Sequence, residues 1–361
     1  MKNFIFEKKK ISLVKRIRIP ENRDLINGIR LNRNERVENF DRNMLSKIFK
    51  TAKEYDLGKY PDQSETYKVL SKYIKVPEKN IQISSGIDGS IKSIFEIFTD
   101  QNEKIAVLSP TYAMYEVYCK VFNTKLIRIG YKKFKLDQKK LFKVIKNSGI
   151  RILFIPNPNQ PIEDNLSPNQ IKKICIECRK KKILLVVDEA YHMFGCKSAI
   201  NLYKSFDNIL ILRTLSKTFG IPSVRFGYIV GKEKIIKILD AYRLSYESNF
   251  LTDHVVKFFI KNSNYINSYI TRINKGRDFL KKELQKLNFE VYGGQANFLL
   301  INFKKNLLKD KIVKSLNKNK IYTKSNYVNE LSSCILVTCG FKNTMNKLLK
   351  IIKKAKRIWI L

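Results

Sequence analysis

The chain has 361 residues, of which 44% are hydrophobic and 11% aromatic, so it can bury a sizeable core and form two globular domains. No apolar run approaches the roughly 20 residues that span a bilayer, so we expect no membrane contact. The formal net charge is +39, from 71 Lys and Arg against 32 Asp and Glu. Because this excess runs along the whole chain, we expect a solvated basic surface and no specific nucleic-acid partner.

The N-terminal segment and the cysteines bear on the compartment. Residues 1–20 are basic, and charges interrupt their short apolar pieces, which is not the pattern of a secretory signal peptide. The six cysteines are scattered, as is typical of a reducing compartment. Cys175 and Cys178 fall within a helical pattern, and Cys334 and Cys339 are too widely spaced for the partner pair of a zinc site. We therefore expect a cytoplasmic protein without a metal centre.

The middle of the chain alternates between short apolar runs and helix-like stretches. The apolar runs are typical of buried strands that end in polar or glycine-bearing turns, and they lie at 104–110, 150–159, 183–191, 208–216 and 226–231. Helical patterns occupy 89–98, 113–122, 137–147 and 168–181, the last with Ser167 and Pro168 as its start signal. This alternation predicts an α/β fold with a mostly parallel sheet, in which ligands gather at the carboxyl ends of the strands.

The pattern changes after about residue 232. Long helical stretches, further apolar segments and two basic helices follow, which is typical of a smaller α+β domain. We expect a large α/β domain over residues 40–245. Residues 1–39 and 246–361 together would form the small α+β domain.

Residues with potential chemistry follow several of the predicted strands. Lys217 comes directly after "ILILRTLS", and a lysine in a desolvated cleft has a lowered pKa and can form a Schiff base. Asp188 ends the run "ILLVVD", where a buried carboxylate needs a partner; a helix N-cap is the alternative interpretation. Tyr112 lies in a turn opened by Pro110 and would, taken alone, be a packed aromatic side chain.

A Gly/Ser turn and an arginine complete the set. In "ISSGIDGSI" a strand is followed by a short turn and a helix start, whose backbone N–H groups can bind an anion. Arg225 follows Lys217 by eight residues. One ligand suits all of these groups: a pyridine aldehyde that carries a phosphate. Asp188 would pair with its protonated ring nitrogen and Tyr112 would stack on the ring, while Arg225 would hold the phosphate.

The chain resembles the class I and II pyridoxal-phosphate-dependent aminotransferases of fold type I, and most of all their histidinol-phosphate aminotransferase branch. The likeness covers most of the chain and is carried by "IRLNRNERV" (29–37), "GKYPDQSETYKVLSKY" (58–73), "SSGIDGSI" (84–91), "NPNQP" (157–161), "DEAY" (188–191), "TLSK" (214–217) and "ANFLL" (296–300). It implies a large domain with a mostly parallel, seven-stranded-type sheet and a smaller α+β domain. It also implies pyridoxal 5′-phosphate as the cofactor and a homodimer with shared active sites.

The resemblance implies roles for individual residues. Lys217 would form the imine with the cofactor and then move the proton, Asp188 would hold the ring nitrogen, and Tyr191 the phenolic oxygen. Gln160 would also reach the phenolic oxygen. Tyr60 would contact the cofactor phosphate of the neighbouring subunit. The remaining cofactor contacts implied are Gly86, Ile87, Asp88, Tyr112, Thr214, Ser216 and Arg225.

The cofactor loops depart from the family pattern in a few positions. In the "NPNQP" loop, Gln160 stands where the family has Asn, which keeps an amide but adds a methylene. Ile162 and Glu163 replace Thr-Gly directly after this loop. Ile87 replaces a serine of the phosphate-binding turn, so that one hydroxyl contact is lost while the backbone N–H remains.

The substrate positions depart further. The family holds the substrate's anionic group with an arginine where this chain has Leu336, and a second arginine upstream is Lys324 here. Asn297 lies on the strand that ends near the substrate in the family. From Leu336 we expect a substrate other than histidinol phosphate, with a distal part that is neutral or held differently. The alternative is that another basic residue has taken the arginine's place.

The leading hypothesis is a PLP-dependent aminotransferase, which moves an amino group between an amino donor and a keto or aldehyde acceptor. Two alternatives stay open. One is a decarboxylase of amino acids or their phosphates on the same scaffold, because the bond that breaks depends on which substituent stands perpendicular to the ring. The other is a catalytically impaired relative that acts as a binding protein, against which the nearly complete set of cofactor residues speaks.

Overall fold

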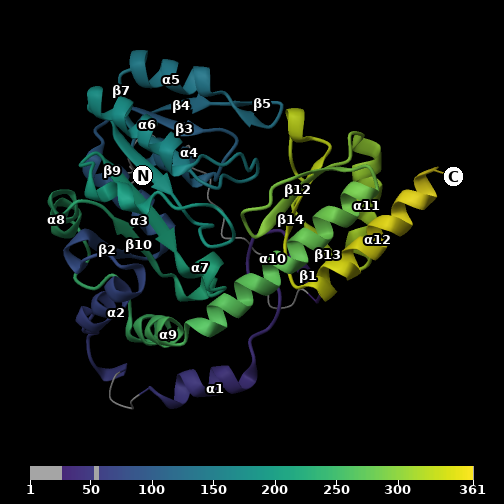
Figure 1. Cartoon of the computed structure of the whole chain (residues 1–361), viewed down its shortest axis with the longest axis horizontal. Coiled ribbons are helices and arrows are strands. Elements are labelled where there is room, and N and C mark those ends of the chain that lie inside the picture. The colour runs from purple at the N-terminus through teal and green to yellow at the C-terminus, as the bar shows by residue number, and fades with distance from the viewer. Residues whose placement is uncertain (1–26, 53–56, 361) are drawn as a thin grey trace, which may run out of the picture.

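The computed structural model describes residues 27–52 and 57–360, with side chains up to residue 357. The basic segment 1–26, which we assigned to the small domain, lies outside the described residues. Figure 1 shows a larger α/β body and, beside it, a smaller body in which long helices cover a second sheet. In the part of the chain that the structure describes, no helix is both long and apolar enough to cross a membrane.

A seven-stranded sheet forms the centre of the larger body, in the order β2-β10-β9-β8-β7-β3-β4. Its strands are β2 (Ile81–Ser84), β3 (Lys104–Leu108), β4 (Lys125–Ile129), β7 (Ile150–Pro156), β8 (Leu184–Asp188), β9 (Ile209–Thr214) and β10 (Gly227–Val230). All pairings are parallel except those of β10, which runs antiparallel to β2 and β9. The prediction of an α/β fold with a mostly parallel sheet is confirmed.

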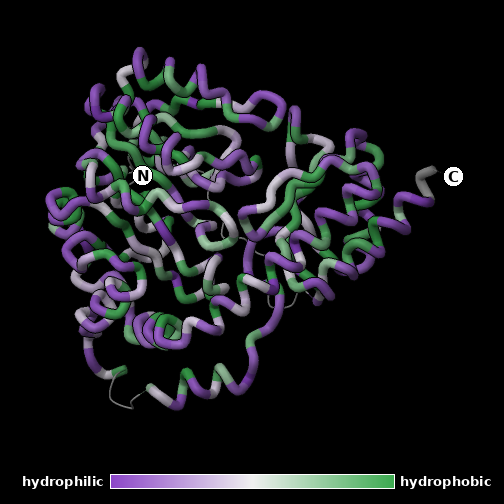
Figure 2. Tube along the Cα trace, viewed as in Figure 1, coloured by the Kyte–Doolittle hydropathy of each residue, from purple (hydrophilic) through white to green (hydrophobic). Residues whose placement is uncertain are grey.

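The strands form because their continuous apolar runs can be buried on both faces of the sheet. Every residue of β9 is buried, including Arg213 near its end. Figure 2 shows hydrophobic residues concentrated on the central strands and hydrophilic ones on the outer helices. The expected strands and the observed ones agree to within a few residues, because burial on both faces is a strong local signal.

The helices of the larger body cover both faces of this sheet. They are α2 (Ser64–Ile74), α3 (Gly86–Phe98), α4 (Met114–Val121), α5 (Gln138–Asn147), α6 (Pro168–Lys180), α7 (Leu215–Thr218), α8 (Glu233–Ala241) and α9 (Phe250–Lys261). Helix α6 begins as its sequence predicts, since Ser167 and Gln170 form a reciprocal capping box around Pro168. A small hairpin of β5 (Tyr131–Lys132) and β6 (Lys135–Leu136) precedes α5.

The smaller body contains an antiparallel sheet in the order β11-β12-β14, from β11 (Glu290–Tyr292), β12 (Phe298–Asn302) and β14 (Cys334–Thr338). The helices α10 (Ser263–Lys286), α11 (Asn306–Lys318) and α12 (Lys342–Ile360) lie beside it (Figure 1). In addition, β1 (Ile29–Leu31) pairs in parallel with β13 (Ile321–Thr323). Part of the N-terminal segment therefore contributes to the smaller body.

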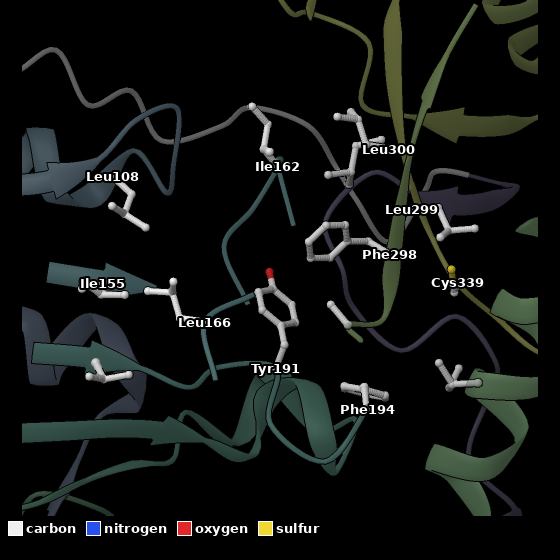
Figure 3. Packing of buried hydrophobic residues seen from close by; sticks show 14 of the residues in the cluster. Leu108, Ile155, Ile162, Leu166, Tyr191, Phe194, Phe298, Leu299, Leu300 and Cys339 are labelled. Atoms are coloured by element: carbon white, nitrogen blue, oxygen red, sulfur yellow. The ribbon is translucent and has the colours of Figure 1, made fainter. Parts of the chain in front are cut away.

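The two bodies share one hydrophobic cluster. Tyr191 of the larger body and Phe298 of β12 pack edge to face, with ring centroids 5.2 Å apart. Figure 3 shows this pair between Ile162 and Leu166 on one side and the strand with Leu299 and Leu300 on the other. This continuous packing fixes the segments that meet at the carboxyl edge of the large sheet.

Helix α1 (Arg42–Lys50) stands at the periphery of the molecule (Figure 1). It is held to α9 by His254, whose Nε2 lies 2.7 Å from the Ile48 carbonyl oxygen. Two apolar side chains are exposed on it, Phe49 by 59% and Leu45 by 38%.

Candidate active site

A cavity of about 840 Å³ opens where the carboxyl ends of the parallel strands meet the smaller body. Most residues predicted for the site line this cavity, namely Ile87, Asp88, Tyr112, Gln160, Asp188, Tyr191, Thr214, Ser216, Lys217, Arg225 and Lys324. Segments far apart in the sequence are therefore brought to one place by the strand order of the sheet, as expected for a doubly wound fold.

Lys217 lies on α7, a single helical turn that directly follows β9. Its Nζ donates a hydrogen bond to the carbonyl oxygen of Arg33 at 3.1 Å. Burial lowers the pKa of Lys217 to about 8, while Glu35 opposes this shift and Arg225 adds to it. At pH 7 about a tenth of the Lys217 side chains are therefore neutral amines, and hence nucleophiles, far more than for a lysine with the ordinary pKa.

Asp188 ends β8 and is 5% exposed. Its Oδ2 accepts a hydrogen bond from the Tyr115 hydroxyl at 2.7 Å, and its Oδ1 accepts one from the backbone N–H of Ala190 at 2.9 Å. Burial raises the pKa of Asp188 to about 6, although both hydrogen bonds lower it. The carboxylate thus caps the turn that follows β8; the described residues there form no helix for the N-cap that was the alternative interpretation, and the carboxylate lines the cavity.

Tyr115 and Asn34 are site residues that the sequence reasoning missed. The only local signal for Tyr115 was its position three residues after Tyr112, on the predicted helix that follows. Asn34 is 1% exposed, and its Nδ2 donates to the Tyr191 hydroxyl at 2.9 Å and to the Gln160 Oε1 at 3.4 Å. The Tyr191 hydroxyl in turn donates to Gln160 Oε1 at 3.1 Å. Gln160 therefore takes part in the site in spite of its extra methylene.

The start of α3 and the side chain of Arg225 pack against each other at one end of the cavity. Gly86 has a φ of +72°, and a Cβ added there would lie 2.8 Å from Nη2 of Arg225. The left-handed backbone conformation favours glycine at this position, and the guanidinium lies directly against it. Thr214 caps α7 by accepting from the Ser216 N–H at 3.1 Å. The start of α3, the hydroxyls of Thr214 and Ser216, and one arginine converge here, which is a suitable site for a phosphate.

Tyr112 lies on the open side of the cavity and is 42% exposed. Its hydroxyl donates to Oδ1 of Asp88 at 3.1 Å, and its ring meets that of Tyr115 edge to face. The ring position is therefore fixed by a contact from α3 and one from α4, so that Tyr112 is not simply a packed core residue.

Four predicted residues do not line this cavity. Tyr60 is 80% exposed and stacks on Tyr246, with ring centroids 4.8 Å apart. Leu336 is fully buried within β14, and Gly86 is buried against the guanidinium of Arg225. Asn297 is 1% exposed; its Nδ2 donates to the Asn34 carbonyl oxygen at 3.2 Å, and its Oδ1 has no partner among the described residues. The structure thus gives neither Leu336 nor Asn297 the direct exposure to the cavity that we expected of a substrate contact.

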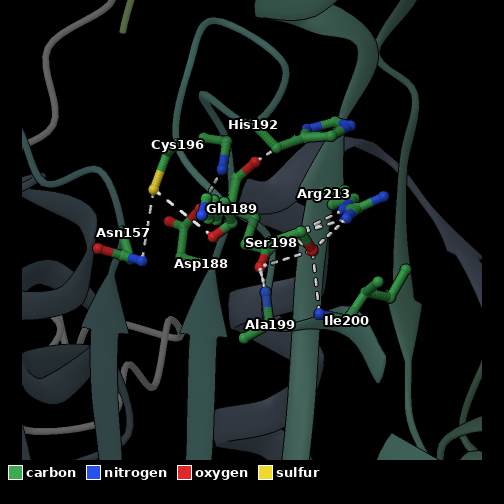
Figure 4. Close-up of polar contacts among 11 residues, drawn as sticks. Asn157, Asp188, Glu189, His192, Cys196, Ser198, Ala199, Ile200 and Arg213 are labelled. Carbon is green, nitrogen blue, oxygen red and sulfur yellow. Dashed lines mark hydrogen bonds and ion pairs between the residues drawn. The ribbon is translucent and has the colours of Figure 1, made fainter. Parts of the chain in front are cut away.

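A buried polar network lies at the carboxyl ends of β8 and β9 (Figure 4). Arg213 pairs with Glu189 at 2.9 Å and donates to the Ser198 hydroxyl at 2.6 Å. Glu189 also accepts from the Ser198 hydroxyl and the Ala199 N–H. Because Glu189 follows Asp188 directly, this network holds the backbone from which the Asp188 carboxylate projects.

Comparison with known proteins identifies the family. Residues 32–352 match the family described as aminotransferase class I and II. The chain therefore belongs to the class I and II aminotransferases. This confirms the prediction of an aminotransferase, and neither the decarboxylase nor the binding-protein alternative is favoured.

Within this family the chain is similar to histidinol-phosphate aminotransferases. It is 33% identical over 309 residues to the one from Buchnera aphidicola subsp. Cinara cedri, covering 82% of this chain and 85% of that protein. It is 29% identical to the one from Clostridium novyi, covering 90% and 91% of the two chains.

Solved structures show the same fold. The histidinol-phosphate aminotransferase from Sinorhizobium meliloti, in complex with pyridoxal-5′-phosphate, superposes with a TM-score of 0.84 at 18% identity, covering 92% of this chain and 91% of that one. The histidinol-phosphate aminotransferase from Clostridium acetobutylicum gives a TM-score of 0.81 at 23% identity, covering 91% and 99%. The prediction of fold type I is confirmed.

Proposed function

We propose that the cavity binds a phosphate-bearing pyridine cofactor between Lys217 and Arg225, and that this chain transfers amino groups there. The cofactor is pyridoxal 5′-phosphate. The single observation that carries this proposal is the lowered pKa of the buried Lys217, which shares one cavity with the buried carboxylate of Asp188. The close contact between Gly86 and Arg225 leaves backbone N–H groups and a guanidinium for the phosphate, so the residues present fit the cofactor.

When bound, the cofactor supplies an electron sink that stabilises negative charge on the reacting carbon. Lys217, as a neutral amine, would attach the cofactor and would then move a proton as general acid and base. Asp188, as a carboxylate, would hold the proton of the ring nitrogen. Tyr191 and Gln160 would lie at the phenolic oxygen; the Tyr191 hydroxyl donates to Gln160 Oε1 and accepts from Asn34 Nδ2, and these hydrogen bonds orient both side chains.

Borohydride reduction of the reconstituted protein tests this proposal. We expect the cofactor to be fixed to the peptide that contains Lys217, and Lys217→Ala to abolish the label. Lys204→Ala, which changes an exposed lysine outside the cavity, is the matched control. Label on another peptide, or no label after reconstitution, would contradict the proposal. With the amine-loaded protein, an added keto acid should restore the absorbance of the aldehyde form without release of carbon dioxide.

We also propose that the protein is a homodimer in which Tyr60 completes the partner's site. Tyr60 is 80% exposed and does not line the cavity of its own chain. Other large apolar side chains are exposed on α1, on α9 and in loops, namely Leu45 and Phe49, Leu251, and Leu57 and Leu244. Exposed apolar side chains are unfavourable in water, and a second copy of the chain would bury them.

Mixing two inactive variants tests the shared site. Tyr60→Phe and Lys217→Ala chains, refolded together, give mixed dimers in which one site carries both defects and the other carries neither. We expect partial recovery of activity. Absence of recovery in confirmed mixed dimers, or a monomer in sedimentation, would refute the proposal.

Two further assignments are proposals. From the sequence we expect the domain boundary near residue 245; because α9 packs on the larger body, where the Thr252 hydroxyl donates to the Val224 carbonyl oxygen at 2.9 Å, we propose that the boundary follows α9. The pairing of β1 with β13 supports the inclusion of the N-terminal segment in the small domain. We place the protein in the cytoplasm, which is supported by six free cysteines. Limited proteolysis and cell fractionation would test these two assignments.

A further inference from the structure

The wall of the cavity on the side of the smaller body carries two cationic side chains. Arg33 follows β1 and Lys324 follows β13, and both line the cavity. The two strands are parallel neighbours in which Leu31 is opposite Thr323. Arg33 is two residues beyond Leu31 and Lys324 is one residue beyond Thr323, so both follow the carboxyl ends of this strand pair and line the same cavity.

Lys324 supplies a positive charge to the cavity wall next to position 336, where the family has an arginine and this chain has leucine. Lys324 and Leu336 lie directly opposite each other and exchange both backbone hydrogen bonds, at 3.1 and 2.8 Å. Residues paired in this way project their side chains from the same face of the sheet. Leu336 is fully buried, whereas Lys324 lines the cavity. The absence of an arginine at position 336 therefore does not leave this wall neutral.

The two cations act on each other. Burial lowers the pKa of Lys324, and the charge of Arg33 lowers it further, so the two charges are within Coulombic range. Two like charges that face one cavity are stabilised by an anion between them. A wall with two positive charges suits an anionic group, whereas from Leu336 we expected a substrate whose distal part is neutral or is held in another way.

The acidic residues of the cavity have other contacts. Asp188 accepts from Tyr115, and Asp88 from Tyr112. Glu35 lies 3.6 Å from the Nη2 of Arg30 and raises the pKa of Lys217. These three carboxylates thus interact with groups other than Lys324.

We propose that Arg33 and Lys324 together bind an anionic group of the substrate, a phosphate or a carboxylate. The proposal rests on the proposed function, because the cavity is the same one. Arg33 can hold such a group through two parallel N–H donors, whereas Lys324 acts as a point charge. Arg33 would thereby become a specificity-determining residue, supplied by the N-terminal segment in place of the arginine absent at position 336.

Three amines on one imidazole scaffold test the proposal: histidinol phosphate, L-histidine and histidinol, which carry a phosphate, a carboxylate and a neutral hydroxyl. We expect the holoenzyme to prefer one anionic amine to histidinol. Arg33→Gln and Lys324→Gln should each reduce this preference, measured as the ratio of kcat/KM values, by about tenfold or more, the usual effect of losing one charge-assisted hydrogen bond. The preferred amine distinguishes a phosphate from a carboxylate. Lys314→Gln, an exposed lysine on α11, is the control.

Where none of the three amines is turned over, inorganic phosphate and acetate serve as probes, and their binding is followed by the absorbance of the bound cofactor. Weaker binding to both variants than to Lys314→Gln supports the proposal. A preference for histidinol, an unchanged ratio in both variants, or anion binding that neither variant weakens would overturn it. Borohydride labelling of Lys217 is checked in every variant. If Lys217 is not labelled in the unmodified protein, the proposed function is wrong, whatever the result for the substrate anion.

Discussion

The hydroxyl of Tyr115 lies 2.7 Å from Oδ2 of Asp188, and both side chains are buried. Burial alone would favour the neutral carboxylic acid, which cannot pair with a protonated ring nitrogen. The Tyr115 hydroxyl donates to the carboxylate and so lowers its pKa against the effect of burial. Tyr115 is therefore a positioning residue that also keeps Asp188 ionised.

Tyr115→Phe should shift the pH dependence of cofactor binding. The pKa of Asp188 is already raised to about 6, and loss of the hydrogen bond raises it further. A hydrogen bond to a charged group contributes about 1.5–3 kcal/mol, which corresponds to about 1–2 pKa units. Affinity for the cofactor, followed by absorbance, should thus fall with decreasing pH at a higher pH than in the unmodified protein. Tyr118→Phe is the control. If cofactor affinity depends on pH in the same way in Tyr115→Phe and Tyr118→Phe, the proposed effect of the Tyr115 hydroxyl is wrong.

Glu35→Gln should change the pH at which the cofactor attaches to Lys217. Attachment needs the neutral amine, so its rate in the apoprotein should rise with pH through a pKa of about 8. Glu35 stabilises the charged lysine, so its neutralisation lowers this pKa and moves the half-maximal rate to lower pH. The rate of cofactor attachment, measured by absorbance, tests this. Glu65→Gln, far from the cavity, should leave the profile unchanged; an upward shift in Glu35→Gln would contradict the assignment.

Arg213→Met should destabilise the protein strongly. The side chains of Arg213 and Glu189 are 8% and 2% exposed, so the substitution leaves a buried charge without its partner (Figure 4). The expected loss in the free energy of unfolding is about 3–5 kcal/mol. Arg128→Met breaks the exposed pair with Glu116, whose contact of 2.7 Å is as short, and should cost less than about 1 kcal/mol. Equal losses in urea unfolding of the two variants would show that burial does not decide the effect.

Glu163 links the two bodies, because its Oε1 accepts from the Gln295 N–H at 2.7 Å. Glu163→Ala removes this hydrogen bond, and because the Gln295 N–H is exposed and can bond to water instead, the free energy of unfolding should fall by about 0.5–1.5 kcal/mol. Amide exchange at Gln295 should become faster as well. Glu163→Gln keeps an acceptor oxygen and should recover most of the stability. Glu177→Ala, on the surface of α6, should change stability by less than about 0.5 kcal/mol; a similar loss there would speak against the link.

The sequence allowed accurate prediction where a local signal sufficed. Strands buried on both faces and the Ser167 cap of α6 depend only on neighbouring residues. The same holds for residues at strand ends, because the strand order brings such ends together whatever the details of packing. Lys217 and Asp188 could therefore be placed in one cavity from the sequence.

Other features depend on contacts between distant segments. Asn34 reaches Tyr191 only because β1 joins the smaller body. No local sequence pattern predicts that contact. The face of β14 on which Leu336 lies likewise follows from its pairing with Lys324. A residue's place in a strand can be read from the sequence, but its orientation towards a cavity depends on its partner strand.

The antiparallel direction of β10 has a consequence for how this chain can change. Thr214 at the end of β9 is opposite Gly227 at the start of β10, so residues 215–226 form a connection closed at both ends. Lys217 and Arg225 both belong to it. An insertion or deletion between them would change the span between the amine and the guanidinium, and no adjustment elsewhere in the sheet could restore it. If Lys217 and Arg225 hold the two ends of the cofactor as we propose, the size of the cofactor limits how far this connection can vary in length.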